Sequence, residues 1–426
     1  MVIVIIIVAI VMLLIGFEMM LVLGVPAFLI KEVFFGQVPD AVLIQKLVGG
    51  VNHTTLLAIP FFVFAAELMA SGEIAKRLTN LIKAAFGHRA GGIGHTTIGG
   101  SMAFGSVSGS APATVAALGR LMYPELRKAG YDEKFSLGLI VSSAETALLI
   151  PPSITLIIYG WMTGSSITGL FVGSLAVGIV LGLAFAALVA FESHRYKVGQ
   201  SEKPKPGTLR RAFREAIWPL GLPVIILGGI YSGFFTPTEA AAVSVIYAIA
   251  VEALVYRELG VRKLFEVTER AAVSTTIIFI LLAFGSVLAY FITVAQVPTA
   301  ITNFLEIIEA GPVMFLLIVN IAFLIAGMFI DPNSALLILV PPLYPVAVTM
   351  GIDPIHFGLV VCLNICIGMI TPPFGLDIFV ASSTLEKPVT RIIQGVWPFL
   401  AVNLVVLALI TYVPDISTYL PNLLKR

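Results

Sequence analysis

Two proline-interrupted apolar segments, one in each half of the chain, constrain the fold most strongly. Pro151-Pro152 and Pro372-Pro373 lie 221 residues apart. Each pair follows an earlier turn with a proline of its own, at Pro112 and Pro332, which lie 220 residues apart. A proline removes a backbone donor and clashes with the preceding helical turn, and in lipid the freed groups must be satisfied by protein, water or an ion. Paired breaks in two halves therefore predict a binding site near the bilayer midplane.

The composition places the chain in a membrane. It is 58% hydrophobic and 12% charged, with a mean hydropathy of +1.04, whereas a soluble domain carries roughly twice that charged fraction. Apolar runs of spanning length, about 20 residues, recur from end to end. The first run lacks a basic n-region and a small-residue cleavage site, which favours a retained helix. A net charge of +1 indicates no nucleic-acid partner.

The predicted fold is an all-α polytopic membrane protein built from two inverted repeats, each with one re-entrant hairpin and one broken helix. In the first repeat, 1–191, the expected spans are 1–16, 18–36, 54–71, the broken helix 135–162, and 168–191, with a hairpin at 92–123. A basic linker covers 192–216. In the second repeat, 217–426, the expected spans are 217–235, 237–256, 270–294, the broken helix 355–384, and 392–413, with a hairpin at 312–349.

Five crossings per half invert the second repeat relative to the first. On this topology, loops on one side of the membrane hold all but four of the 25 lysines and arginines. Such an asymmetry marks that side as cytoplasmic, so both termini are expected to be periplasmic. The linker is then a cytoplasmic loop, and a lipid-headgroup switch is the less favoured alternative.

The first hairpin tip is rich in small residues. Ser106, Ser108 and Ser110 alternate with Val107 and Gly109. Two half-helices that end there direct unpaired N–H and C=O groups into one cavity, and hydroxyl and carbonyl oxygens suit a hard cation such as Na⁺. A close-packing face between helices is the alternative, but the copy in the second half favours a site.

The two Pro-Pro breaks release carbonyls one turn upstream. We expect two Na⁺ sites, each between one hairpin tip and one broken helix. The alternative is a simple proline kink around a neighbouring helix. Together with Ser106, Ser108 and Asp331, the expected ion-site residues are Ala147, Ile150, Pro152, Gly327, Gly368, Thr371 and Pro373.

Four of the acidic residues in the predicted spans and hairpins are candidates for a functional role. Asp331 is placed at the second tip, where it can lie near an ion, cap the half-helix that begins at Pro332, or do both. Glu145 and Asp377 flank the breaks and either line the cavity or are buried and hydrogen-bonded. Glu67 is expected to face another subunit or a neighbouring helix.

The chain has no nucleophile–base pair, phosphate loop or metal-ligand cluster, so it is not expected to be an enzyme. No Lys or Arg lies in the core of either hairpin or broken helix. An anion is therefore expected to bind helix ends and polar side chains, for which the candidates are Ser110, Thr114, Asn333 and Ser334. Cys362 and Cys366 are expected to be core residues rather than metal ligands.

Several stretches resemble the large membrane subunit of TRAP transporters, the DctM-like family. They include GSVSGSAPATVAALG from Gly105 to Gly119, LLIPPSI from Leu148 to Ile154, FFTPTEAAA from Phe234 to Ala242, and GMITPPFGLDIFVAS from Gly368 to Ser382. The resemblance covers essentially the whole chain. Glu67 departs from it, because a small or amide residue is expected there.

The resemblance implies an elevator-type, Na⁺-driven importer of organic acids in the bacterial inner membrane, with a C4-dicarboxylate or sialic acid among the candidate substrates. It also implies two partners, a small four-helix membrane subunit that is not fused to this chain and a soluble periplasmic substrate-binding protein. The alternatives are a stand-alone Na⁺- or H⁺-coupled anion transporter of related fold and, from another class, an ion channel.

Overall fold

The computed structural model describes residues 8–9, 11–13, 15–88, 90–196, 198 and 207–424. Within them the chain forms helices and contains no β-strand. Part of the predicted span 1–16 lies outside the described residues. Residues 201–206 of the predicted linker also lie outside them.

The described helices follow the two halves of the sequence. Those of the first half are α2 (Met19–Phe34), α3 (Asp40–Gly49), the 3₁₀-helix η1 (Thr54–Leu57), α4 (Ala58–Ser71), α5 (Ile74–Phe86), α6 (Gly92–Ser108), α7 (Ala111–Lys128), α8 (Glu133–Leu149), α9 (Ile154–Thr163) and α10 (Ile167–Tyr196). Those of the second half are α11 (Thr208–Tyr231), α12 (Pro237–Ala250), the π-helix η2 (Val251–Val255), α13 (Val261–Val294), α14 (Val297–Ile307), α15 (Pro312–Phe329), α16 (Pro332–Thr349), α17 (Pro354–Ile370), α18 (Leu376–Leu385), α19 (Val389–Tyr412) and α20 (Asp415–Leu424).

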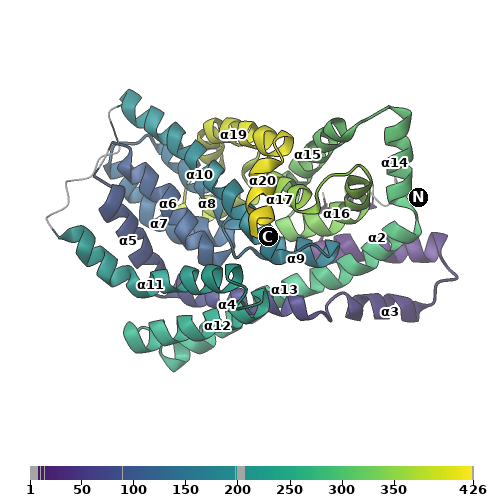
Figure 1. The fold of residues 1–426 in the computed structure, drawn as a ribbon, viewed down its shortest axis with the longest axis horizontal. Helices are drawn as coiled ribbons and strands as arrows, with labels where there is room; N and C mark the ends of the chain where they lie inside the picture. The colour runs from purple at the N-terminus through teal and green to yellow at the C-terminus, as the bar shows by residue number, and fades with distance from the viewer. Residues whose placement is uncertain are drawn as a thin grey trace.

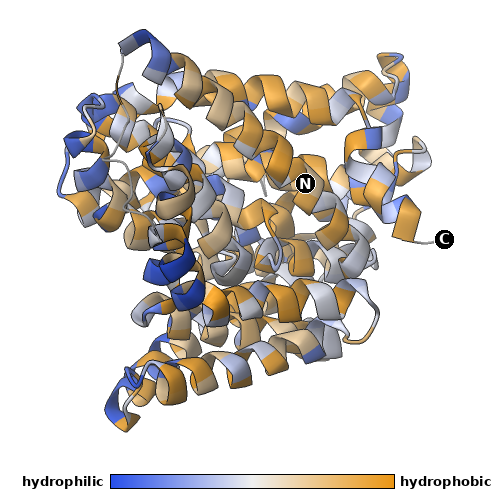
Figure 2. Ribbon diagram, turned by 60° about the vertical axis from the view of Figure 1, so that its left-hand side comes forward, coloured by the Kyte–Doolittle hydropathy of each residue, from blue (hydrophilic) through white to orange (hydrophobic). Residues whose placement is uncertain are grey.

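Among the described residues, eight helices are long and apolar enough to cross a membrane, and the bent pair α8 and α9 makes a ninth if it is counted as one span. This confirms the predicted class, an all-α polytopic membrane protein. Figure 2 shows hydrophobic residues over most helix bodies and hydrophilic residues gathered mainly along one edge of the molecule, as expected for helices that face lipid.

The helices form two groups (Figure 1). We call α2, α3, α4, α11, α12 and α13 the lateral layer, and α6 to α10 together with α15 to α20 the central block. In the lateral layer, α13 packs on α2, α3 and α4, and α12 packs on α4. The helices α5 and α14 connect the two groups along the chain.

Each Pro-Pro pair separates two helices. α8 ends at Leu149 and α9 begins at Ile154 with an axis bend of 41°. α17 ends at Ile370 and α18 begins at Leu376. Both Pro-Pro peptide bonds are cis. The helices end here because the proline nitrogens donate no hydrogen bond to the preceding turn.

The two hairpins turn by different local chemistry. α6 ends at Gly109, whose φ of +55° lies in the left-handed region that favours glycine. At the second turn, Asp331 caps α16 and Pro332 occupies the first helical position, where a missing N–H costs nothing.

The hairpins and broken helices pack in a repeated arrangement. In each half the first hairpin helix packs against the first part of the broken helix, as α6 on α8 and α15 on α17. The second part of each broken helix packs on the hairpin of the other half, as α9 on α16 and α18 on α7. The two halves therefore interlock within the central block, and their tips come together.

Candidate functional site

The first hairpin tip is a compact polar turn. The Ser110 N–H donates to the Ser108 hydroxyl at 3.4 Å, and the Ser108 and Thr114 hydroxyls lie 3.3 Å apart. The Thr114 hydroxyl donates to the Ser110 carbonyl at 2.7 Å. Ser106 donates to its own helix, at the Ala103 carbonyl. Ser108 and Thr114 thus hold the turn in shape while their oxygens keep free lone pairs.

Close backbone approaches join this tip to the first broken helix. A Cβ atom at Gly109 would lie 2.6 Å from the carbonyl oxygen of Pro152, and one at Gly105 would lie 2.3 Å from the Cα of Ala147. Only glycine permits such contacts. The structure therefore places the Pro152 carbonyl beside Gly109 at the tip, and the backbone of Ala147 beside Gly105, one helical turn before it.

The break itself leaves acceptors without helical donors. The Ile150 N–H still donates to the Thr146 carbonyl. The Ala147 carbonyl would bond in a regular helix to residue 151, which is a proline and has no N–H. The carbonyl oxygen of Ala147 therefore lacks its regular helical donor and can accept a hydrogen bond or bind an ion.

The second hairpin tip is organised by Asp331. One carboxylate oxygen accepts the N–H groups of Asn333 and Ser334 at 3.0 and 3.2 Å, and the other accepts the Ser334 hydroxyl. This confirms the capping role of Asp331. The side-chain carbonyl of Asn333 is buried and has no hydrogen-bond partner among the described residues.

The second break repeats the close approach of the first. A Cβ atom at Gly368 would lie 2.5 Å from the Cα of Gly327, so α15 and α17 touch through backbone. The Thr371 N–H donates to the Gly368 carbonyl at 3.0 Å, and the Thr371 hydroxyl donates to the Ile367 carbonyl at 2.6 Å. Unlike Ala147, Gly368 therefore keeps one backbone donor and offers only its second lone pair.

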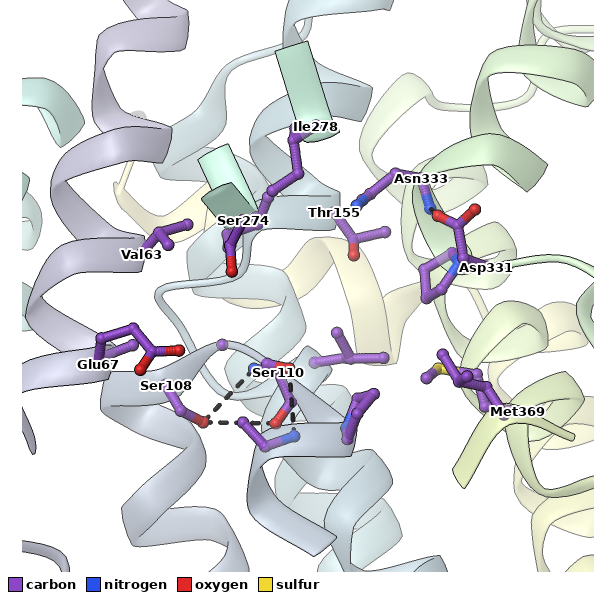
Figure 3. Close-up of a pocket in the computed structure, with 18 of the residues that line it drawn as sticks. Val63, Glu67, Ser108, Ser110, Thr155, Ser274, Ile278, Asp331, Asn333 and Met369 are labelled. Carbon is purple, nitrogen blue, oxygen red and sulfur yellow. Dashed lines mark hydrogen bonds between the residues drawn. The ribbon is translucent and has the colours of Figure 1, made fainter. Parts of the chain in front are cut away.

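A cavity of about 250 Å³ lies where the tips meet (Figure 3). Its walls come from both hairpin tips, both broken helices, and α4 and α13 of the lateral layer. Of the predicted site residues, the cavity walls contain Ser108, Ser110, Asp331 and Asn333. The remaining candidates are not cavity-lining residues, and they are Ser106, Thr114, Ala147, Ile150, Pro152, Gly327, Ser334, Gly368, Thr371 and Pro373.

Helix termini set the local electrostatics. Residues at the N-terminal ends of α7, α9, α16 and α18 all line the cavity, and α18 has no side-chain cap. Helix N-termini carry partial positive charge and unpaired N–H groups. Leu148 and Met369, near the C-terminal ends of α8 and α17, add carbonyl ends of opposite sign. The cavity thus presents fixed dipoles of both signs.

The lateral wall contains residues that sequence reasoning missed as cavity residues. Glu67 on α4 and Ser274 on α13 line the cavity from the lateral layer, and Thr155 on α9, also missed, lines it from the central block. Arg270 Nε lies 3.1 Å from Glu67 Oε2, which agrees with the expectation that Glu67 faces a neighbouring helix. An acidic residue within an apolar helix indicates from the sequence that Glu67 has a special environment. Its partner Arg270 is 203 residues away in the chain, so the sequence does not identify it.

Glu145 and Asp377 are not cavity-lining residues. Both are fully buried, and the Asn403 amide donates to both Glu145 oxygens at 3.0 and 3.3 Å. Glu145 is thus the buried, hydrogen-bonded acid that was one of two expectations. Neither oxygen of Asp377 has a partner among the described residues.

No group of three or more His, Cys, Asp or Glu side chains capable of holding a metal ion occurs among the described residues. Cys362 and Cys366 are free and buried on α17.

A protein-family model and similar curated proteins both indicate the same family for this chain. Residues 6–416 match the family model described as "Tripartite ATP-independent periplasmic transporter, DctM component". The chain is 39% identical over 415 residues to the ectoine/5-hydroxyectoine TRAP transporter large permease protein of Ruegeria pomeroyi, covering 97% of both chains. It is 38% identical over 386 residues to the C4-dicarboxylate TRAP transporter large permease protein of Pseudomonas aeruginosa, covering 90% of both.

Among solved structures, the fold resembles the YdaH transporter of Alcanivorax borkumensis. The TM-score is 0.61 with 15% sequence identity, over 89% of this chain and 88% of that one. At this identity the likeness concerns the fold alone.

Proposed function

Because the chain belongs to the DctM family of tripartite ATP-independent periplasmic transporters, we propose that it is the large subunit of a Na⁺-coupled importer of a small organic acid or zwitterion. Proteins of this family are multi-pass transporter permeases of the bacterial inner membrane, not enzymes. The observation that carries the proposal is the single cavity at which both hairpin tips and both broken helices converge.

Sodium coupling is supported by the donor set around the tips. Na⁺ is a hard cation that takes oxygen ligands, and the first tip brings the Ser108 hydroxyl near the Pro152 carbonyl, while the backbone of Ala147 touches Gly105 of the same hairpin. At the second tip, Asp331 lies near the close approach of Gly327 and Gly368 along the same hairpin and broken helix. We propose one ion behind each tip, where the ion offsets the charge of a bound anion.

Such ions supply the driving force. A tenfold Na⁺ gradient is worth about 1.4 kcal/mol per ion, and the membrane potential adds about 2.3 kcal/mol per net charge per 100 mV. Two ions that move with one monoanion are electrogenic and concentrate the substrate strongly.

The substrate is proposed to occupy the cavity itself. Relatives are named for ectoine and for C4-dicarboxylates, and the sequence leaves sialic acid as a further candidate. The helix N-termini of α7 and α9 can receive a carboxylate. Ser110 and Asn333 supply hydrogen bonds from the two tips.

We propose an elevator mechanism in which the central block moves against the lateral layer. The cavity lies at the boundary between the two groups, because α4 and α13 form one wall and the tips form the other. Interlocking of the two halves within the central block favours movement as a unit.

The family is tripartite, so the permease works with a small membrane subunit and a periplasmic binding protein. For this chain we propose a separate four-helix subunit and a soluble protein that delivers substrate, with both termini of the large subunit in the periplasm.

Reconstitution tests the proposal. Liposomes that contain this chain and its small subunit should take up labelled substrate only when the binding protein and an inward Na⁺ gradient are both present. Uptake that continues unchanged when K⁺ replaces Na⁺ contradicts sodium coupling. A Na⁺ conductance that needs no substrate supports a channel instead, and uptake without either partner supports a stand-alone transporter.

A further inference from the structure

The described residues that line the cavity include two charged side chains, and both are carboxylates. They are Glu67 on α4 and Asp331 at the second tip, and the lining contains no Lys or Arg. A cavity built only to hold acids would not carry two carboxylates and no basic residue on its walls, because like charges at close range repel strongly in a low dielectric.

Asp331 is already engaged. Its oxygens accept two backbone N–H groups and one hydroxyl from its own helix turn, and it lies at the positive end of α16. The negative charge of Asp331 is therefore already stabilised by the donors of the second hairpin tip. Glu67 is the carboxylate that remains to meet a substrate.

Glu67 has a partner on one side only. Arg270 binds Oε2 from α13 at 3.1 Å, and Arg270 itself is not among the lining residues. Each carboxylate oxygen has more than one acceptor site, and among the described residues Oε1 and the second lone pair of Oε2 have no partner. In Figure 3 the Glu67 carboxylate points from α4 toward the first tip, across the cavity from Asp331 and Asn333.

The other walls have the opposite character. Ser110 and Thr155 belong to the N-terminal ends of α7 and α9, and such ends attract anions. The N-terminal end of α16 is already occupied by the Asp331 carboxylate. Away from the Asp331 turn the cavity is therefore polarised, with the anion-attracting ends of α7 and α9 on the central block and the Glu67 carboxylate on the lateral layer.

We propose that the substrate is a compact zwitterion, whose carboxylate binds the helix N-termini of α7 and α9 and whose cationic N–H group donates to Glu67. This inference rests on the proposed function and narrows its substrate class. Arg270 is a positioning residue that holds Glu67 against the wall and limits its attraction for cations that lack a carboxylate.

The test compares two six-membered-ring carboxylates. Ectoine carries a protonated amidine, and cyclohexanecarboxylate has no cation. Binding is measured on the purified permease with its small subunit in nanodiscs, by thermal shift and by calorimetry, at saturating Na⁺. The wild type should bind ectoine at least tenfold more tightly than cyclohexanecarboxylate.

Three variants test whether the preference for ectoine depends on the Glu67 carboxylate. Glu67→Gln should weaken ectoine binding at least tenfold and leave cyclohexanecarboxylate binding unchanged or stronger. Glu67→Asp should restore part of the preference, because it keeps the charge. Glu266→Gln is the matched control, since it removes a glutamate from an exposed ion pair with Arg262 on α13 and should change neither affinity.

Several outcomes overturn the inference. A wild type that binds ectoine no more tightly than cyclohexanecarboxylate or binds neither, or a Glu67→Gln protein whose preference is unchanged, shows that Glu67 does not recognise a cation. Such a protein can still require Na⁺ for acid uptake, which leaves the proposed function intact. Loss of Na⁺ dependence with the zwitterion preference retained contradicts sodium coupling but not the role of Glu67.

Discussion

At the residue scale, Asp331 combines a helix cap with a proposed ion contact, and the two can be separated. Asp331→Ala removes both and should lower stability by about 1 kcal/mol through loss of the cap. Because Asn is an equally good cap, Asp331→Asn should keep stability while it loses the negative charge. We expect both variants to need at least tenfold more Na⁺ for half-maximal uptake.

The measurement is uptake in proteoliposomes against Na⁺ concentration, alongside thermal unfolding. Normal Na⁺ dependence of both variants at wild-type expression removes Asp331 from the ion site. A defect confined to Asp331→Ala assigns the effect to the cap.

The buried pair of Glu145 and Asn403 gives a second prediction at this scale. Asn403→Leu leaves a buried carboxyl without its donors, which costs about 1–3 kcal/mol. The double variant Glu145→Leu with Asn403→Leu removes both polar groups and should be markedly more stable than Asn403→Leu alone.

Thermal unfolding in detergent checks this pair. If the double variant is destabilised by the sum of the two single effects, the acid does not depend on Asn403, and a separate role for Glu145 follows.

At the element scale, the first hairpin tip should tolerate little added volume. Ser108 is 4% exposed and lines the cavity, so Ser108→Leu should fill the cavity and reduce uptake below a tenth of wild type without unfolding the protein. Ser383→Leu on the exposed face of α18 is the control. Full activity of Ser108→Leu places the tip away from the transport path.

The contact between α15 and α17 predicts a second effect at this scale. Gly368→Ala places a methyl group 2.5 Å from the Cα of Gly327, so the helices must separate, at a cost of about 1–3 kcal/mol. A melting temperature equal to wild type contradicts this packing. Gly228→Ala is the control, because nothing lies within 4 Å of its Cβ position.

Helix positions followed from the sequence more directly than helix contacts did. The expected hairpin at 312–349 corresponds to α15 and α16, which cover Pro312–Phe329 and Pro332–Thr349. Proline and aspartate act on their own turns, so the positions of the ends are local properties. α9 of the first half packs on α16 of the second, and α18 of the second half packs on α7 of the first. These contacts join residues distant in sequence, and the pattern of apolar residues does not indicate them.

At the scale of the whole molecule, movement of the central block against the lateral layer can be arrested. Ile278 on α13 and Asn333 on α16 line the cavity from opposite groups. With Cys362 and Cys366 replaced by alanine, a short bifunctional thiol reagent that joins Ile278→Cys and Asn333→Cys should abolish uptake. The control is Thr54→Cys with Thr238→Cys, because Thr238 Oγ1 on α12 lies 3.5 Å from the carbonyl of Thr54, in the short helix η1 that leads directly into α4 of the lateral layer.

Labelled uptake before and after cross-linking is the measurement. Each double-cysteine protein that is not cross-linked serves as its own reference. Transport that continues through the α13–α16 cross-link contradicts relative movement of the two groups.

The sequence by itself determined the membrane class, the helix breaks and the two tips, because apolar runs and prolines act through the backbone within a turn or two of their own positions. Only the tertiary structure decided which oxygen atoms and charges meet. Glu67 and Arg270 are 203 residues apart, and the cavity combines the tips with α4 and α13. Convergence of this kind depends on how separate helices pack, and packing depends on the surfaces of all of them together.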